Sequence, residues 1–255
     1  MRTISVLVLV TAAIVPAGAA DRTAQPVPLA IDSRGGIVVQ IRVNDEGPFK
    51  FMLDTGSARS LVSDDLARVL VAPVVAKSEV ITSAGSDMRL VVRLASLALG
   101  PARVGAILAP VLPTAHLARL GPDVQGLLGQ DFLSAFNYTL DYRRARLVWD
   151  DQATCDAAGA VRMTAAEGRF VMAVENGDGR PLRLVPDTGA EVAVLFAGRT
   201  PARSISRLRV GSTALGDLRP VVVSREDENA DGLLPLHGFA SVSFAAQGAC
   251  VTVRK

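Results

Sequence analysis

Aromatic side chains are scarce in this sequence, which has eight Phe, two Tyr and one Trp among 255 residues. Proteins that grip single-stranded nucleic acid stack its bases on aromatic side chains, so this function class is disfavoured. Charge of one sign is also not in excess, because 27 Lys and Arg face 25 Asp and Glu without long blocks of like charge. We therefore expect no nucleic-acid partner.

Histidine and cysteine each occur only twice, as His116, His237, Cys155 and Cys250. Four residues scattered in this way lack the spacing of a structural zinc site. We therefore expect no metal and no organic cofactor, and we interpret both histidines as loop or core residues.

Aliphatic residues and glycine, in contrast, are abundant. Apolar residues account for 49% of the chain, and 22 residues are Gly. This composition favours short buried strands separated by tight turns. The length is intermediate between one and two domains, so the first expectation is an all-β or β-rich enzyme with a sizeable core.

The first twenty residues have the pattern of a secretory signal peptide. Arg2 precedes an apolar run over residues 4–15, and small residues follow up to Ala20. The run is too short to span a bilayer, so we expect an exported protein without stable membrane insertion. The periplasm is the expected destination, with full secretion left open. In such a compartment Cys155 and Cys250 are expected to form a disulfide, with two buried free thiols as the alternative.

The remaining chain repeats itself. Residues 35–56 and 168–189 align without a gap, and both end in Asp-Thr-Gly. Each copy predicts a strand, a turn and a second apolar strand that ends at the Asp. Residues 125–129 (QGLLG) and 231–235 (DGLLP) form a further matching pair. We therefore expect two homologous lobes, at residues 21–150 and 151–255.

The first copy carries an additional segment. Residues 74–95 predict two strands around a turn at Ser83, Ala84, Gly85 and Ser86, and the second copy has no comparable segment. We interpret this hairpin as a flap that covers a cleft on one lobe.

Two Asp-Thr-Gly motifs at homologous positions resemble the aspartic peptidases of the pepsin and retropepsin type. The resemblance extends over nearly the whole chain after residue 20, and its size is similar to two fused retropepsin-like lobes. It implies an all-β, bilobal, pseudo-twofold acid-protease fold with a cleft between the lobes. It also implies an aspartic endopeptidase that takes an extended peptide or protein substrate. We expect the protein to act as a monomer.

Asp54 and Asp187 are the catalytic candidates. Two carboxyls held a few ångströms apart cannot both ionise cheaply, so they share a proton, and one can act as base toward a water. Ser57 follows the first motif and Ala190 the second. We predict that the Ser57 hydroxyl donates a hydrogen bond to Asp54, which makes Asp54 the more readily ionised partner.

Four further residues are expected to support the two carboxyls. Gly56 and Gly189 leave room for the backbone amide to approach each carboxylate. The family arrangement implies that Thr55 and Thr188 hydrogen-bond the loop of the opposite lobe.

The second lobe departs from the family pattern at Pro186, Pro235 and His237. Pro186 removes a backbone donor beside Asp187 and so raises a question about local hydrogen bonding. Two alternatives therefore stay open. One is a catalytically degenerate, retropepsin-like peptide-binding protein of the periplasm, and the other is a lipocalin-like carrier in which the repeated motif is coincidence.

Overall fold

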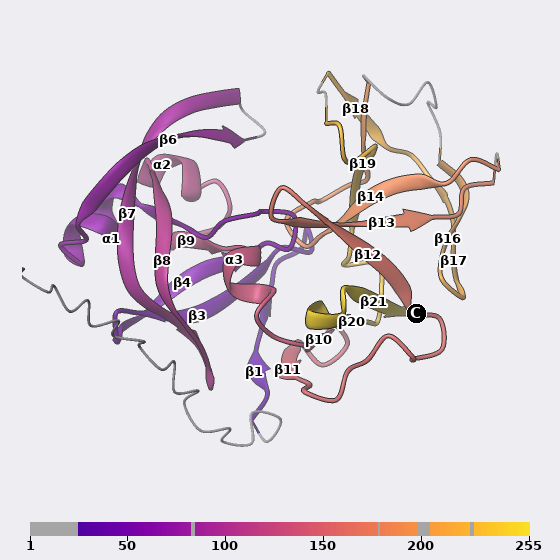
Figure 1. Ribbon diagram of the computed structural model, residues 1–255, viewed down its shortest axis with the longest axis horizontal. Coiled ribbons are helices and arrows are strands. Elements are labelled where there is room, and N and C mark those ends of the chain that lie inside the picture. The colour runs from indigo at the N-terminus through magenta and orange to yellow at the C-terminus, as the bar shows by residue number, and fades with distance from the viewer. Residues whose placement is uncertain (1–24, 83–84, 178, 198–204, 225–226) are drawn as a thin grey trace, which may run out of the picture.

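The computed structural model describes residues 25–82, 85–177, 179–197, 205–224 and 227–255. The signal peptide expected at residues 1–20 and the flap residues Ser83 and Ala84 lie outside these ranges. The described residues form three β-sheets with only short helices, which confirms the all-β fold class. Two lobes lie side by side with a third group of strands beneath them (Figure 1).

The first lobe is built on an eight-stranded sheet of order β2-β3-β4-β9-β5-β8-β7-β6. Its strands are β2 (Ala30–Ile31), β3 (Ile37–Val43), β4 (Glu46–Leu53), β5 (Leu61–Ser63), β6 (Val74–Thr82), β7 (Gly85–Leu99), β8 (Ala102–Leu112) and β9 (Val124–Leu128). Three short helices belong to the same half of the chain: α1 (Asp64–Val69), α2 (Thr114–Leu117) and α3 (Gln130–Leu133). β3 alternates buried apolar and more exposed residues, as a strand with one face on the core should.

The second lobe repeats this arrangement in a shorter form. Its strands are β13 (Arg169–Val174), β14 (Leu182–Asp187), β15 (Val194–Phe196), β18 (Val221–Val223) and β19 (Gly232–Pro235), with a separate hairpin of β16 (Ile205–Val210) and β17 (Thr213–Leu218).

The strand registers of the two lobes agree residue by residue. In both lobes the strand that ends at the Asp lies antiparallel to the preceding strand and parallel to the strand containing the Gly-Leu-Leu segment. The equivalent pairs are Val39 with Phe51 and Met172 with Leu184, then Phe51 with Gly126 and Leu184 with Gly232. The two copies therefore share one fold and not only a motif.

A group of strands from both halves of the chain joins the lobes. It consists of β1 (Val27–Pro28), β10 (Tyr138–Asp141), β11 (Arg146–Trp149), β12 (Val161–Ala166), β20 (Ser241–Ala245) and β21 (Cys250–Arg254), with the 3-10 helix η2 (Ala246–Gly248) between the last two. β10 and β20 pair antiparallel at its centre, with Tyr138 opposite Phe244. These strands continue into the second lobe as one eleven-stranded sheet. The boundary at residues 150 and 151 stays a prediction.

The hairpin expected at residues 74–95 is formed by β6 and β7, and its role as a flap stays a prediction. Thr82 pairs with Gly85, and of the four residues predicted for the turn, Gly85 and Ser86 belong to β7 while Ser83 and Ala84 lie outside the described ranges. β7 is long enough to pair with β6 through its first part and to join the core of the lobe with its last residues, where Leu97 and Leu99 are buried. Among the described residues, no helix is long and apolar enough to cross a membrane.

Candidate active site

Two apolar strands carry the repeated Asp-Thr-Gly loops to the seam between the lobes. β4 ends in the buried residues Phe51, Met52 and Leu53, and Asp54 follows directly. β14 is buried over its last four residues and ends at Asp187 itself. β4 pairs in parallel with β9, and β14 pairs in parallel with β19. These pairings fix the position at which each buried strand ends, so Asp54 and Asp187 both lie at the seam.

The two threonines lock the loops together across the seam. The Thr55 hydroxyl donates to the carbonyl oxygen of Pro186 at 2.7 Å, and the Thr188 hydroxyl donates to that of Leu53 at 2.7 Å. Each hydroxyl also accepts the backbone N–H of the other threonine at 3.0 Å. Both side chains are buried, so four cross-lobe hydrogen bonds form in a place that excludes water.

Each carboxylate is held by its own loop. Asp54 Oδ1 accepts the N–H groups of Gly56 at 2.9 Å and Ser57 at 3.1 Å. Asp187 Oδ1 accepts those of Gly189 at 2.7 Å and Ala190 at 3.1 Å. The carboxyls of Asp54 and Asp187 are in addition hydrogen-bonded to each other, which requires a proton between them.

The two glycines make this approach possible. A Cβ on Gly56 would lie 2.4 Å from Cγ of Asp187, and one on Gly189 would lie 3.1 Å from Cγ of Asp54. Each glycine thus faces the carboxyl of the opposite lobe while its N–H binds the carboxyl of its own. A side chain at Gly56 would push the two carboxyls apart.

The two aspartates differ in acidity. Burial raises the pKa of Asp54, but hydrogen bonds from Gly56, Asp187 and Ser57 hold back part of that rise. Burial, together with the charge on Asp54, raises the pKa of Asp187 well above its ordinary value. The shared proton therefore rests on Asp187, and Asp54 is the partner that ionises first.

The cause of this asymmetry is not the one predicted from the sequence. The Ser57 hydroxyl donates to the carbonyl oxygen of Arg59 at 2.9 Å and not to Asp54. Only the backbone N–H of Ser57 reaches Asp54, and Ala190 offers Asp187 the same contact. The prediction for the hydroxyl is wrong because a nearby carbonyl competes for it.

Polar residues after the first Gly-Leu-Leu segment brace the Asp54 loop, and sequence reasoning missed them. Gln130 is buried, and its side chain donates to the carbonyl oxygen of Thr55 at 2.8 Å. Asp131 accepts from the backbone N–H and hydroxyl of Ser60 at 2.8 and 2.6 Å. The sequence does contain a signal for them, because the polar pair Gln130-Asp131 follows the apolar Gly-Leu-Leu segment after a single glycine.

The departures in the second lobe leave the site geometry in place. Pro186 lacks an N–H, but its carbonyl oxygen accepts the Thr55 hydroxyl just as Leu53 accepts that of Thr188. Pro235 still pairs with Asp187 at the end of the parallel strands. His237 lies against the backbone of Gly35, where a Cβ would come within 2.4 Å of the imidazole Cγ.

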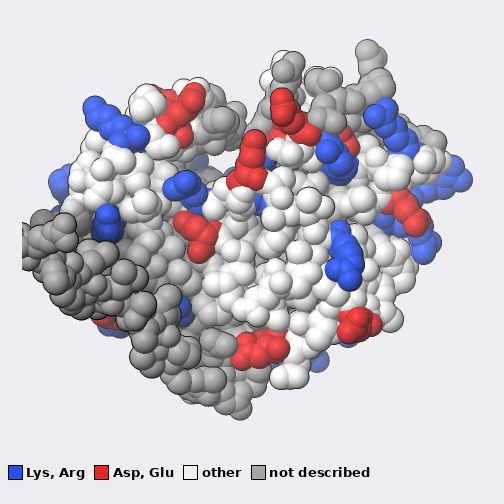
Figure 2. All heavy atoms as spheres, viewed as in Figure 1, with Lys and Arg blue, Asp and Glu red and all other residues white. Residues whose placement is uncertain are grey.

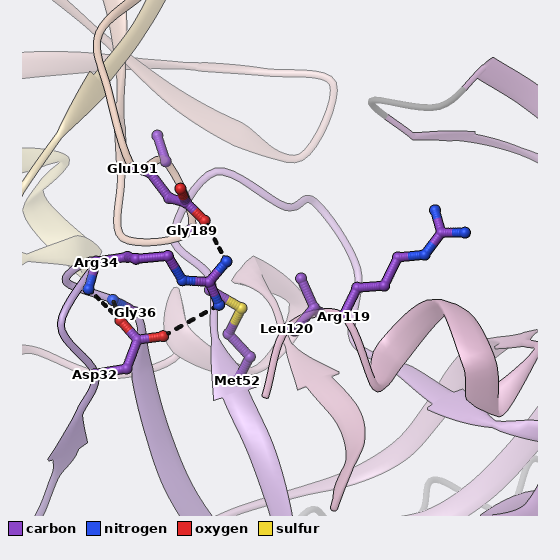
Figure 3. Close-up of a pocket in the computed structure, with 9 residues that line it drawn as sticks. Asp32, Arg34, Gly36, Met52, Arg119, Leu120, Gly189 and Glu191 are labelled. Atoms are coloured by element: carbon purple, nitrogen blue, oxygen red, sulfur yellow. Dashed lines mark hydrogen bonds and ion pairs between the residues drawn. The ribbon is translucent and has the colours of Figure 1, made fainter. Parts of the chain in front are cut away.

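A pocket opens beside the second Asp-Thr-Gly loop and continues the seam (Figure 3). Gly189 and Ala190 line one side, and Met52 and Leu120 supply apolar surface from the first lobe. Across the pocket, Arg34 of the first lobe donates to Glu191 of the second at 2.8 Å. The space-filling view is hollowed between the lobes, with acidic and basic side chains at the rim (Figure 2).

The other residues of interest lie away from the carboxyls. Cys155 and Cys250 are joined by a disulfide. Gly85 and Ser86 begin β7 in the flap hairpin. The described residues contain no group of three His, Cys, Asp or Glu side chains placed to hold a metal ion.

Comparison with known proteins adds independent support for the first lobe. Residues 39–132, which include Asp54, match the aspartyl protease family. A retropepsin-like aspartic protease from Rickettsia conorii matches 49% of this chain and 90% of its own, with 20% identity and a TM-score of 0.37. No curated protein matches the chain. The family match supports the resemblance to aspartic peptidases and a function of aspartic-protease type.

Proposed function

We propose that the protein is an aspartic endopeptidase that hydrolyses peptide bonds with a water activated between Asp54 and Asp187. The observation that carries the proposal is the pair of hydrogen-bonded carboxyls at the seam, of which Asp187 has the higher pKa. Such a pair supplies one base and one acid at the same pH.

The reaction uses these two groups in turn. The Asp54 carboxylate takes a proton from the water, whose oxygen attacks the carbonyl carbon, while Asp187 gives its proton to the carbonyl oxygen. In the tetrahedral intermediate, Asp54 then protonates the amide nitrogen and Asp187 takes back a proton from a hydroxyl. The C–N bond breaks, and the dyad returns to its starting state.

The surrounding residues serve to hold the two carboxyls in place. Thr55 and Thr188 keep the loops in contact, and the N–H groups of Gly56 and Gly189 orient one oxygen of each carboxylate. We propose that the β6–β7 hairpin covers the substrate, which binds in an extended conformation. Because Gly85 has no side chain and Ser86 a small one, the flap can contact substrate mainly through its backbone.

The test compares peptide cleavage by the wild type, Asp54→Asn and Asp187→Asn. We expect each substitution to lower kcat/KM by roughly 10²–10⁴-fold, because a general acid or base contributes about that much. Asp123→Asn is the matched control, since Asp123 is an exposed surface acid that pairs with Lys50. Equal cleavage by all four proteins would overturn the proposal. Peptide binding without cleavage, equal in the wild type and both variants, would favour a binding protein.

We also propose that the protein is exported to the periplasm. The proposal rests on the pattern of residues 1–20 and is supported by the disulfide between Cys155 and Cys250, which is typical of oxidising compartments. Fractionation of cells that express the full chain tests it, and a product confined to the cytoplasm would contradict it.

A further inference from the structure

The pocket at the seam holds one cation that has no partner among the described residues. Four charged side chains line the pocket, Asp32, Arg34, Arg119 and Glu191. Arg34 donates to Glu191 at 2.8 Å and lies 3.4 Å from Asp32. Arg119 has no ion pair or hydrogen bond with any residue that the structure describes. Figure 3 shows it extending away from the Arg34 guanidinium.

The acids of the pocket are already engaged by donors of the protein. Asp32 Oδ1 accepts the N–H groups of Arg34 and Gly36 at 2.8 and 2.9 Å, and Oδ2 accepts Arg34 Nη2 at 3.4 Å. Burial alone would raise the pKa of Asp32, but these hydrogen bonds and the Arg34 charge outweigh it and lower the pKa. The Asp32 carboxylate therefore stays ionised, and the Arg34 guanidinium neutralises its charge. Glu191 is held through Oε1 by Arg34. The five N–H donors of Arg119 are therefore the main unused polar groups of the pocket.

The pocket has room and lining for the end of one substrate side chain. Its cavity volume is about 40 Å³, far below the roughly 300–1,000 Å³ of small-molecule sites, so it can take a carboxyl group and not a whole ligand. Met52 and Leu120 offer apolar surface for a side-chain stem, and Gly189 and Ala190 place the pocket next to Asp187. A substrate held at the dyad would thus direct a neighbouring side chain into it.

The aligned position of the second lobe carries an arginine that is paired within the protein. Arg169 stands where Gly36 stands in the first copy of the repeat. Its guanidinium is buried and donates to Asp227 at 2.8 Å. There an internal acid pairs with the arginine, whereas the first-lobe pocket keeps a glycine, open space and the unpaired Arg119.

We infer that Arg119 selects peptide substrates that carry an acidic side chain, Glu or Asp, in the seam pocket. The inference rests on the proposed peptidase function and specifies its substrate class. The carboxylate of the substrate side chain would accept charge-assisted hydrogen bonds from Arg119, and its stem would cover Met52 and Leu120. Arg119 is a specificity residue, because it acts on substrate and not on the scissile bond.

The experiment profiles cleavage of a peptide library in which each position around the scissile bond carries Glu, Gln, Lys or Leu. For the wild type we expect one position at which Glu exceeds its neutral isostere Gln by roughly fivefold or more, because the pair forms at a partly exposed site. In Arg119→Gln this ratio should fall to about one, and in Arg119→Glu the same position should favour Lys. Arg162→Gln, an exposed arginine on β12, is the matched control and should leave the ratio unchanged.

The outcomes separate this inference from the proposed function. Cleavage without an acidic preference at any position, or a preference that survives in Arg119→Gln, overturns the inference while the peptidase proposal stands. Absence of cleavage overturns the peptidase proposal. In that case, the affinities of Glu and Gln peptides for the wild type and Arg119→Gln, measured by fluorescence anisotropy, decide the inference. Equal affinities overturn it, and a Glu preference that is lost in Arg119→Gln supports it.

Discussion

At the scale of single residues, the two aspartates differ because their surroundings differ. Asp187 is buried and faces the charge of Asp54, whereas Asp54 receives more hydrogen bonds and is partly exposed. The same pair of side-chain types can thus supply a base and an acid.

This difference predicts a bell-shaped dependence of kcat/KM on pH. Activity requires Asp54 ionised and Asp187 protonated, so it should fall at low pH as Asp54 takes up a proton and at high pH as Asp187 loses one. Because both pKa values are raised, both limbs should lie above the ordinary aspartate value of about 4. Initial rates on a peptide without titratable groups measure the profile. An alkaline limb whose midpoint lies below pH 4 would contradict the assignment of Asp187 as the acid.

A second residue-scale prediction concerns the threonines. Thr55→Val should lower the free energy of unfolding by about 2–4 kcal/mol, because the Pro186 carbonyl and the Thr188 N–H lose their partner in a buried place. Urea denaturation measures this change. Thr55→Ser keeps the hydroxyl and is the control. Equal stability of the valine and serine variants would show that the cross-lobe bonds contribute little.

At the scale of elements, the seam depends on two glycines that lie within the parallel strand pairs β4–β9 and β14–β19. Gly126 on β9 lies under the ring of Phe51, where a Cβ would come within 2.3 Å. Gly232 on β19 has the equivalent position, and its Cβ would lie 2.0 Å from the carbonyl oxygen of Val194. Both strands are flanked on two sides, so neither can move aside.

We therefore expect Gly126→Ala and Gly232→Ala each to destabilise the protein by about 3 kcal/mol, the upper part of the range for overpacking. The loss should be at least as large for Gly232, because its obstacle is backbone and not a side chain. Gly238→Ala is the control, since a Cβ there meets nothing within 4 Å. Thermal denaturation of the three variants is the measurement, and an unchanged Gly232→Ala protein would contradict the strand packing.

Much of this element-scale structure can be predicted from the repeat. The gapless alignment of residues 35–56 with 168–189 implies equal registers, and Val39–Phe51 and Met172–Leu184 pair accordingly. The pairing of β6 with β7 follows from local strand and turn patterns in the same way. Patterns within about twenty residues contain this information because hairpin contacts are local.

Contacts between distant segments could not be predicted in this way. The Arg34–Glu191 pair joins residues 157 apart, and nothing in the sequence around either residue indicates its partner. This pairing depends on the meeting of two lobes, which a single sequence read in segments does not encode locally. The Ser57 hydroxyl is a local case of a different kind, because several acceptors lie near it and only the folded loop selects the carbonyl oxygen of Arg59, two residues away.

At the scale of the whole molecule, two separate regions hold the lobes together: the joining strands and the seam. β10 of the first half pairs with β20 of the second, and Thr139 and Ser243 share a hydrogen bond of 2.7 Å between them. Above this sheet, the threonine bonds and the Arg34–Glu191 pair connect the lobes at the site. The geometry of the dyad is therefore supported independently of the lower sheet.

The disulfide belongs to the lower sheet and should act on stability more than on catalysis. It ties Cys155, in the segment that leads from β11 to β12, to Cys250 on β21 across a sequence separation of 95 residues. A loop of that size restricts the unfolded chain strongly, so the double variant Cys155→Ala, Cys250→Ala should lose about 2–5 kcal/mol of unfolding free energy. Because the threonine bonds remain, kcat of the folded variant at 25 °C should stay within about twofold of the wild type. Urea denaturation with and without reductant provides the comparison, since reductant should destabilise the wild type and leave the double variant unchanged. A large loss of kcat in a folded double variant would show that the lower sheet positions the carboxyls after all.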